Sequence, residues 1–204
     1  MGYFEYGTKE LGYLKQKDKK LGYIIDEIGM IKRKINKDLF SALIASVISQ
    51  QISTKAAVTV ESRLLDLAVN LTPENIAKFS VNEIQKCGMS FRKSDYIKSI
   101  AEYFIENTID FANLNKLEDP EIIKELTKLK GVGAWTAEMM LIHTFERRDI
   151  LSFNDLGIRR GIMKLYSLDS LSKEEFEEYK EKYSPYGTVA SLYLWEISSK
   201  EYVL

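Results

Sequence analysis

The chain has 204 residues, of which 45% are hydrophobic and 29% are charged; its net charge is −1 and its pI is near 6. This length and composition suit a globular protein of one large domain or two small ones. No apolar run approaches the roughly 20 residues of a membrane span, and the N-terminus lacks a signal-peptide core, so an intracellular, cytoplasmic protein is expected. The charge balance argues against a strongly basic nucleic-acid coat, although it allows a DNA enzyme with a local basic face.

Cys87 is the single cysteine of the chain. One cysteine excludes an internal disulfide and any four-cysteine site, including an iron–sulfur cluster. We therefore expect Cys87 to be a small apolar core residue and expect no required cofactor.

Helix signals recur along the whole chain. Apolar residues repeat at spacings of three and four in three stripes. The stripes are Leu39, Leu43, Ile44, Val47 and Ile48; Ile97, Ile100, Ala101, Phe104 and Ile105; and Ile122, Ile123, Leu126 and Leu129. Expected helix starts are Thr72-Pro73, Asp119-Pro120, Ser80 with Glu83, and Ser172 with Glu175; expected ends lie at Gly88 and before Pro185.

These signals predict an all-α protein of roughly nine to eleven helices, because the one strand-like run, Ile150–Phe153, is too short to build a sheet. We expect two helical subdomains that flank a cleft. Residues 1–38 and 165–204 would form one helical layer from both chain ends. Residues 39–164 would form a central domain that carries a helix-hairpin-helix at about 120–145 and the loop of Asp155.

The segment LKGVGAWTA, from Leu129 to Ala137, contains a Gly-x-Gly turn. A helix from Pro120 to about Lys128 should run into this turn, and a second helix should start near Ala134. The glycines allow close backbone approach, and the N–H groups at the new helix start attract an anion such as a DNA phosphate. On the turn alone, a tight connection without a ligand is the simpler interpretation.

Two further motifs accompany the turn. Asp155 follows Trp135 by twenty positions in NDLGIRR, and the segment SPYGTVASLYLW ends at Trp195. Together these motifs resemble the helix-hairpin-helix (HhH-GPD) DNA glycosylase superfamily, and within it the 3-methyladenine DNA glycosylase II family. The resemblance runs from about Leu39 to Trp195. It implies a monomeric DNA repair enzyme whose partner is damaged double-stranded DNA.

The resemblance also implies the roles of individual residues. Asp155 matches the catalytic carboxylate, and Trp135 and Trp195 match aromatic residues of the base pocket. Gln51, in VISQQISTKAA, falls on the residue that fills the gap left by a flipped base. From the residues themselves, the expected phosphate-binding positions at the hairpin are Lys130, Gly131, Gly133 and Thr136, and the basic residues Lys93 and Arg159 are further candidate contacts. The main-chain carbonyls of Thr127, Leu129 and Gly131 match those that hold a monovalent cation, Na⁺ or K⁺.

The chain departs from the family pattern at two positions. Gly187 stands where an arginine is common, so a contact of that arginine is missing or supplied elsewhere. Asn154 stands where many members have a second aspartate, so the site offers one carboxylate. At Gln51 the match is partial, because the family often has an aliphatic residue there.

The implied chemistry suits these residue types. Cleavage of the bond between base and deoxyribose builds positive charge on the sugar, which the Asp155 carboxylate would stabilise while it orients or deprotonates a water. An alkylated base is a cation and a good leaving group, and tryptophan faces attract it by roughly 0.5–2 kcal/mol per contact. Trp135 stands where lyase relatives have a Schiff-base lysine, so hydrolysis without β-elimination is expected.

Each of these residues also has a purely structural interpretation. Asp155 could cap the following helix, and Trp135 and Trp195 could be core aromatics. His143 is expected to be a buried, hydrogen-bonded histidine rather than a base. The arginines at 147, 148, 159 and 160 could form a solvated face. The rival functions are a glycosylase for uracil or an oxidised purine, a noncatalytic helix-hairpin-helix DNA-binding protein, and a small-molecule helical enzyme.

Overall fold

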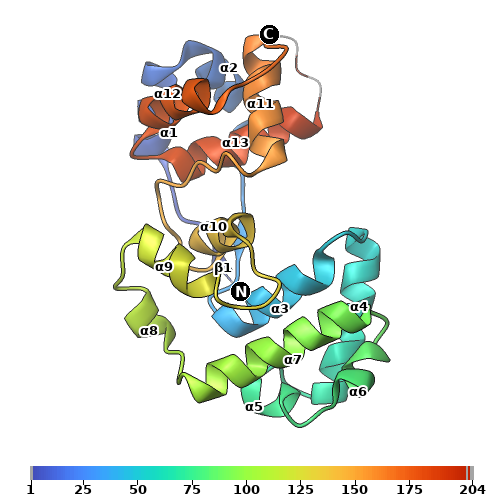
Figure 1. The fold of residues 1–204 in the computed structure, drawn as a ribbon. Coiled ribbons are helices and arrows are strands. Elements are labelled where there is room, and N and C mark those ends of the chain that lie inside the picture. The colour runs from blue at the N-terminus through green and yellow to red at the C-terminus, as the bar shows by residue number, and fades with distance from the viewer. Residues whose placement is uncertain (1, 201, 203–204) are drawn as a thin grey trace. The chain divides into compact units, whose positions relative to one another are not determined.

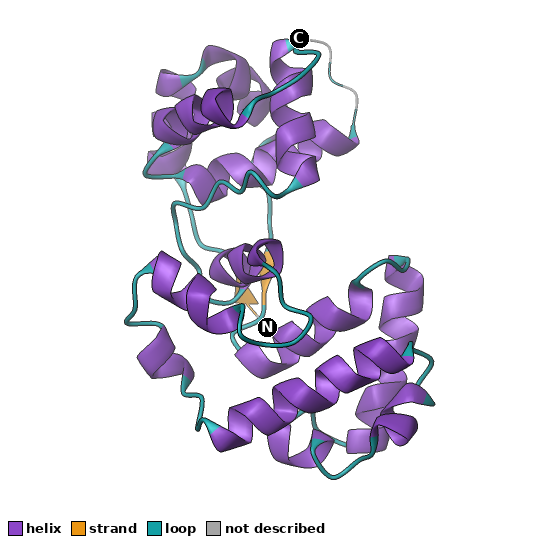
Figure 2. Ribbon diagram, in the orientation of Figure 1, coloured by secondary structure: helices purple, strands orange, loops and turns teal. Residues whose placement is uncertain are grey.

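The structure is a computed structural model that describes residues 2–200 and 202 (Figures 1 and 2). Those residues form thirteen helices and one two-stranded sheet, so the predicted all-α class is confirmed. The thirteen helices of the described residues exceed the nine to eleven expected, and three of them have only four or five residues each. Within the described residues, no helix combines the length and apolar character that crossing a bilayer requires.

The chain divides into two compact units, which are described separately. The terminal unit comprises Met1–Ile35 and Leu141–Leu204, and the central unit comprises Asn36–Met140. The sequence analysis placed the second boundary at residue 165, whereas the structure places it at Leu141. The difference arises because the helix that follows Asp155 packs along the C-terminal helix and therefore belongs with the two chain ends.

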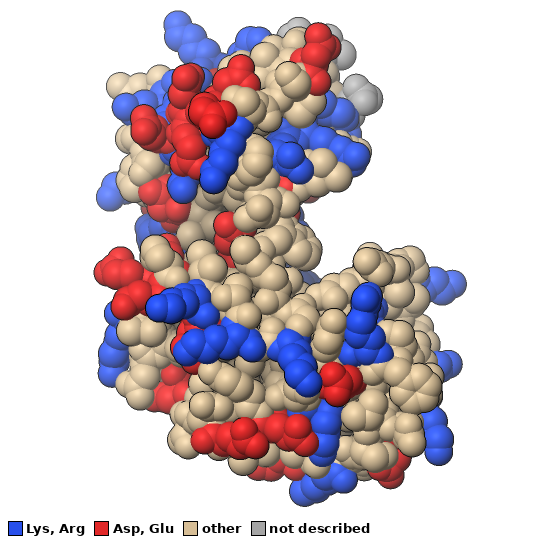
Figure 3. Space-filling view, in the orientation of Figure 1, with Lys and Arg blue, Asp and Glu red and all other residues tan. Residues whose placement is uncertain are grey.

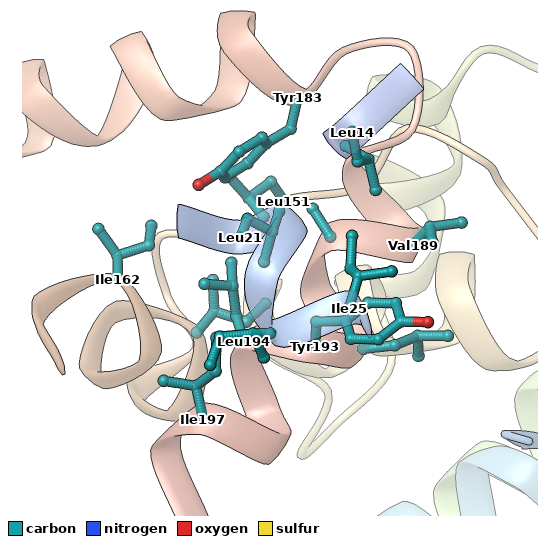
Figure 4. Close-up of a cluster of buried hydrophobic side chains, with 14 of the residues drawn as sticks. Leu14, Leu21, Ile25, Leu151, Ile162, Tyr183, Val189, Tyr193, Leu194 and Ile197 are labelled. Carbon is teal, nitrogen blue, oxygen red and sulfur yellow. The ribbon is translucent and has the colours of Figure 1, made fainter. Parts of the chain in front are cut away.

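The terminal unit is built around one C-terminal helix. Its elements are β1 (Gly2–Tyr3), α1 (Thr8–Lys17), α2 (Lys19–Ile28), β2 (Lys34–Ile35), α11 (Leu156–Tyr166), α12 (Lys173–Tyr183) and α13 (Gly187–Ser199). Helices α1, α2, α11 and α12 all contact α13, which is buried along most of its length. Figure 4 shows the resulting core, in which Leu14, Leu21 and Ile25 lie among Leu151, Ile162 and the side chains of α13.

Gly161 explains how closely α11 approaches α13. A Cβ atom at Gly161 would lie 2.2 Å from the carbonyl oxygen of Leu194, so any side chain there would push the two helices apart. The helix pair that carries Asp155 and Trp195 therefore depends on a glycine that the sequence analysis did not single out.

The sequence pattern predicts no sheet, and the structure contains one small sheet outside the strand-like run. Ile150–Phe153 forms no strand, and the sheet consists instead of β1 and β2, which pair antiparallel with Gly2 opposite Ile35. A strand of two residues is too short to show the alternation of apolar and polar residues by which a strand is recognised in a sequence.

The central unit packs around a long helix, α7 (Phe91–Glu106), which contacts α3, α5 and α6. The other elements are α3 (Leu39–Ser49), α4 (Thr54–Ala68), α5 (Pro73–Ile76), α6 (Val81–Gln85), α8 (Phe111–Leu114), α9 (Asp119–Leu126) and the first seven residues of α10 (Ala134–His143). All five residues of the first apolar stripe are buried. In the other stripes Ile105 is exposed and Ile123 is half-buried, so those stripes are narrower than predicted.

Most predicted helix ends agree with the structure. Thr72, Ser80 and Ser172 cap helices as expected, the last two in capping boxes, and α12 ends at Tyr183 before Pro185. Gly88 has the positive φ, 104°, that its position after α6 predicted. The cap at Asp119 was wrong by one residue, because Glu118 is the N-cap of α9 and Pro120 follows inside the first turn.

Candidate functional site

The predicted hairpin lies in the central unit between α9 and α10. Helix α10 starts at Ala134 as expected, and α9 ends at Leu126, two residues before the expected end. Gly131 has a φ of 81°, and a Cβ atom there would lie 2.3 Å from the Tyr96 ring. Glycine is therefore required at 131 by the fold itself, for its backbone angle and for the ring that packs against it.

Gly133 differs from Gly131 in this respect. A Cβ atom at Gly133 would meet no other atom within 4 Å, and its backbone does not have a positive φ. The first N–H groups of a helix such as α10 have no partners within that helix. Because no atom of the described residues requires glycine at 133, the open space beside it favours a partner that approaches the backbone closely.

The other predicted hairpin residues differ in their access to solvent. Lys130 is exposed and lies 3.6 Å from the Asp95 carboxylate, and Trp135 is 43% exposed on the first turn of α10. Thr136 is only 3% exposed, so its hydroxyl has little access to a phosphate. A phosphate contact at Thr136 would therefore have to use the backbone N–H.

The predicted gap-filling residue, Gln51, is exposed in the loop between α3 and α4. Its φ is 58°, a left-handed conformation that costs non-glycine residues about 1–3 kcal/mol. The neighbouring Gln50 donates a hydrogen bond from Nε2 to the carbonyl oxygen of Gly131 at 3.0 Å. The loop also lines a pocket of about 210 Å³. The loop of Gln51 is thus tied to the hairpin, and its wedge role remains a prediction.

Lys93 has a structural role that the sequence analysis did not anticipate. Its Nζ donates to the carbonyl oxygens of Ile48 at 2.7 Å and Gln50 at 2.5 Å, at the end of α3. Burial, with a smaller contribution from Arg92, lowers the pKa of Lys93. The structure gives Lys93 a role in bracing this loop, and the phosphate contact predicted for it stays a prediction.

The candidate cation site consists of the carbonyl oxygens of Thr127, Leu129 and Gly131. Neutral carbonyl oxygens suit a hard cation. The oxygen of Leu129 accepts a hydrogen bond from the Val132 N–H at 3.1 Å, and that of Gly131 accepts the bond from Gln50. Each carbonyl has a second lone pair, so the donor set is compatible with a monovalent cation, and the site stays a prediction.

Asp155 lies in the terminal unit at the N-terminus of α11. Its Oδ1 accepts hydrogen bonds from the Ile158 N–H at 2.9 Å and from Trp195 Nε1 at 3.0 Å. The residue is 6% exposed. The capping role considered in the sequence analysis is therefore confirmed, while the catalytic role remains a prediction. The contact with Trp195 joins two residues that the sequence analysis assigned to different tasks.

Trp195 is half-buried on α13 and has three close neighbours besides Asp155. The ring of His143 stacks on it at 5.7 Å and 24°, and the guanidinium of Arg33 lies 5.1 Å from its centroid. A Cβ atom at Gly157 would lie 2.9 Å from Trp195 Cδ1 and 3.1 Å from Asp155 Oδ1. Sequence reasoning missed Arg33 and Gly157, because no local pattern links them to position 195.

His143 is half-buried, and its buried Nδ1 atom has no hydrogen-bond partner, which differs from the buried, hydrogen-bonded histidine predicted. Burial, followed by the nearby Arg33 charge, lowers the pKa of His143 from 6.5 to about 4, although Asp155 acts in the opposite direction. His143 is therefore neutral at pH 7 and lies within the cluster around Trp195.

The segment SPYGTVAS holds the loop that precedes Asp155. Thr188 Oγ1 donates to the Arg147 carbonyl at 2.6 Å and accepts from the Ile150 N–H at 3.0 Å, and Ser191 Oγ donates to the Ile150 carbonyl. The Gly187 N–H donates to Asp149 Oδ1 at 2.9 Å, and a Cβ at 187 would lie 2.9 Å from the same oxygen. Glycine at this position therefore fits the local packing, which explains the first departure from the family pattern.

Some charged side chains of the terminal unit make contacts within the protein. Arg148 pairs with the buried Glu10 at 3.1 Å, and the Arg159 guanidinium lies 5.0 Å from the Phe153 ring. On the face that Figure 3 shows, basic and acidic side chains are interspersed over each unit. No group of three or more His, Cys, Asp or Glu side chains within residues 2–200 and 202 could hold a metal ion.

Sequence comparison identifies the class of protein. The HhH-GPD superfamily model, described as base excision DNA repair protein, matches residues 44–185, which is more than half of the chain. This chain belongs to the HhH-GPD superfamily, and the resemblance inferred from the hairpin, Asp155 and the C-terminal motif is confirmed.

Particular relatives narrow the comparison. DNA-3-methyladenine glycosylase 1 of Schizosaccharomyces pombe is 36% identical over 167 residues, which cover 79% of this chain and 73% of that protein. A DNA-3-methyladenine glycosidase structure from Bacillus halodurans has a TM-score of 0.85 at 32% identity. The match covers 97% of this chain and 93% of that one. Another similar structure is that of a Schizosaccharomyces pombe 3-methyladenine DNA glycosylase in complex with abasic DNA. Its TM-score is 0.80 at 33% identity, and the match covers 93% of this chain and 96% of that one.

Proposed function

We propose that this chain is a monofunctional DNA glycosylase that flips alkylated purines of the 3-methyladenine type out of duplex DNA. It hydrolyses their N-glycosidic bond and leaves an abasic site. The enzyme acts as a monomer wherever the cell keeps its DNA. The observation that carries the proposal is the Asp155 carboxylate, held at the start of α11 by Ile158 and Trp195 in a chain of this superfamily. The names of the relatives support the lesion class.

The reaction follows from the charge on the reacting atoms. When the glycosidic bond breaks, its electron pair leaves with the base and neutralises the positive charge of the alkylated ring. The deoxyribose gains positive charge, which the Asp155 carboxylate stabilises. Water then forms the new bond to the sugar carbon, and its proton passes to Asp155 or to solvent. Because Asp155 is 6% exposed, its charge is less screened than it would be in water.

The hairpin supplies affinity that does not depend on sequence. Gly133 and the first turn of α10 bind a phosphate through backbone N–H groups, assisted by Lys130. Na⁺ or K⁺ on the carbonyls of Thr127, Leu129 and Gly131 would add positive charge beside that phosphate. Gln51 fills the gap left by the flipped base, whose extrusion costs a few kcal/mol.

Trp135 supports a hydrolytic reaction rather than a lyase reaction. An indole cannot form a Schiff base with the sugar, whereas the lysine of lyase relatives can. Its ring is 43% exposed, which leaves it accessible for stacking on an electron-poor base. The product is therefore an abasic site in an uncut strand.

The direct test measures base release from methylated duplex DNA by chromatography. We expect the wild-type protein to release 3-methyladenine and expect Asp155→Asn to lower the rate by roughly 10³-fold. Asparagine caps a helix about as well as aspartate, so this change removes the charge and keeps the cap of α11. Asp169→Asn, at an exposed acid of the same unit, is the matched control and should retain activity.

The same assay separates the rival functions. Duplexes that carry uracil or 8-oxoguanine test the other lesion classes, and alkali treatment reveals abasic sites. Strands nicked without alkali, together with a borohydride-trapped adduct, would overturn the hydrolytic assignment. DNA binding without release of any base would leave a noncatalytic helix-hairpin-helix protein. Absence of salt-dependent DNA affinity would favour a small-molecule enzyme.

A further inference from the structure

The hydrogen bond between Trp195 and Asp155 assigns the indole a different task from the one the family match suggested. Trp195 Nε1 lies 3.0 Å from Asp155 Oδ1, the same oxygen that accepts the Ile158 N–H at 2.9 Å. Two donors from different helices therefore meet one carboxylate oxygen, α11 through its backbone and α13 through its side chain. Two such bonds fix both the position and the plane of the carboxylate.

The surroundings of Trp195 are built for this contact. Gly157 leaves room for it, because a Cβ atom there would crowd both Trp195 Cδ1 and Asp155 Oδ1. The ring of His143 stacks on the indole, and Arg33 lies over its π system. A flipped base cannot stack where His143 already lies. The indole is thus held by its neighbours and presents its N–H edge to the carboxylate.

We propose that Trp195 is a positioning residue that orients the Asp155 carboxylate. Glycine is required at 157 because a side chain there would keep the Trp195 indole away from that carboxylate. An indole N–H donates and does not titrate, so Trp195 offers this donor throughout the working pH range. A carboxylate aligned in advance does not need to reorganise when charge develops on the sugar. This inference rests on the proposed function, because it concerns the same carboxylate.

The sharpest test replaces Trp195 with 3-benzothienylalanine, which has the shape of tryptophan but carries sulfur in place of the N–H. We expect kcat for base release to fall about tenfold to a hundredfold, the range for loss of one hydrogen bond to a charged group. We expect KM and the affinity for abasic DNA to stay within about twofold, because an interaction that acts mainly in the transition state affects kcat. Trp195→Phe should give a similar loss, and thermal unfolding checks that both variants fold.

Gly157→Ala tests the same hydrogen bond without changing either of the residues that form it. The added methyl group would displace Trp195 and Asp155 from each other, so we expect a comparable loss of kcat. Gly12→Ala is the matched control, because Gly12 lies on α1 of the same unit and a Cβ atom there meets nothing within 4 Å. The control should retain wild-type kcat and KM.

The outcomes separate this inference from the proposed function. An active wild-type protein whose benzothienylalanine variant keeps full kcat would overturn the positioning role and leave the glycosylase intact. A raised KM with unchanged kcat in Trp195→Phe would instead indicate base stacking and would also overturn it. A wild-type protein that releases no base overturns the proposed function and this inference together.

Discussion

The hairpin of the central unit and the Asp155 cluster of the terminal unit are built in opposite ways. The hairpin offers backbone N–H groups, and its glycines and the first turn of α10 lie within a few residues of one another. The Asp155 cluster uses side chains, and its members Arg33, His143 and Trp195 come from distant parts of the chain. A hairpin that offers backbone N–H groups can be encoded locally, whereas a carboxylate held by donors from two helices depends on how those helices pack.

The difference also shows what each glycine does. Gly131 serves the fold, because its φ is positive and Tyr96 packs against it, while Gly133 has open space around it. Gly157 and Gly161 both lie on α11. The first admits the Trp195 side chain and the second admits the backbone of α13. Glycines that look alike in the sequence therefore have different consequences when they are changed.

The largest effect is expected from valine at the two hairpin glycines. Gly131→Val would force a β-branched residue into a left-handed conformation and against the Tyr96 ring, so unfolding free energy should fall by about 4 kcal/mol. Gly133→Val should cost less than about 1 kcal/mol in stability but should weaken DNA binding roughly tenfold for every sequence. Denaturant unfolding and fluorescence anisotropy at fixed salt measure the two quantities.

Each variant of that pair controls for the other. If Gly133→Val unfolds the protein as Gly131→Val does, the division between a folding glycine and a binding glycine is wrong. Binding that weakens for some DNA sequences and not for others would also contradict a contact made to phosphate.

A somewhat smaller change in the free energy of unfolding is expected from the protonation of His143 as the pH is lowered. Its pKa is about 4 in the folded chain and 6.5 ordinarily, so between these values the unfolded chain binds the proton more readily. The stability contribution is therefore complete above pH 6.5 and is lost as the pH falls toward 4. The loss amounts to about 3 kcal/mol. Urea unfolding measured at intervals between pH 7 and pH 4 gives the slope.

His143→Phe isolates the contribution of the histidine, because phenylalanine keeps a ring beside Trp195 but does not titrate. The unfolding free energy of the wild type should fall by about 3 kcal/mol relative to that of the variant as the pH falls from 6.5 to 4. A difference that stays constant over this range would show that His143 is not held neutral by its surroundings.

The smallest effect is expected at the loop of Gln51. Lys93→Met keeps the aliphatic stem but removes the donors to the carbonyls of Ile48 and Gln50, at a cost of about 1–2 kcal/mol. Hydrogen exchange should accelerate in the loop and remain unchanged in α13. Lys116→Met, at an exposed position of the same unit, is the control. Unchanged exchange in the Lys93 variant would mean that the ammonium does not brace the loop.

The sequence revealed those features that depend on neighbours along the chain. The capping boxes at Ser80 and Ser172, the start of α10 at Ala134 and the cap at Asp155 follow from short-range spacing. Errors of one or two residues at Asp119 and at the end of α9 arose because several residues there could cap or end the helix. The strands β1 and β2 were missed, because their pairing joins residues more than thirty positions apart.

The candidate site was predicted as separate residues, and the contacts between them were not predicted. Asp155 and Trp195 were both singled out, and their hydrogen bond was not, because residues forty positions apart meet only after α11 packs on α13. Thr136 was expected at a phosphate, yet its side chain is buried. Burial depends on which face of a helix meets its neighbours, and a position in the first turn does not decide that.

By itself the amino-acid sequence determined the helical class, the Gly-x-Gly hairpin and the helix cap at Asp155, because local spacing and residue type are sufficient for these. Tertiary structure alone decided that Trp195 donates to that carboxylate, that Gly157 and Gly161 leave room for α13 beside α11, and that burial lowers the pKa of His143. These properties depend on distances between helices and on exclusion of water, which exist only once the chain has packed.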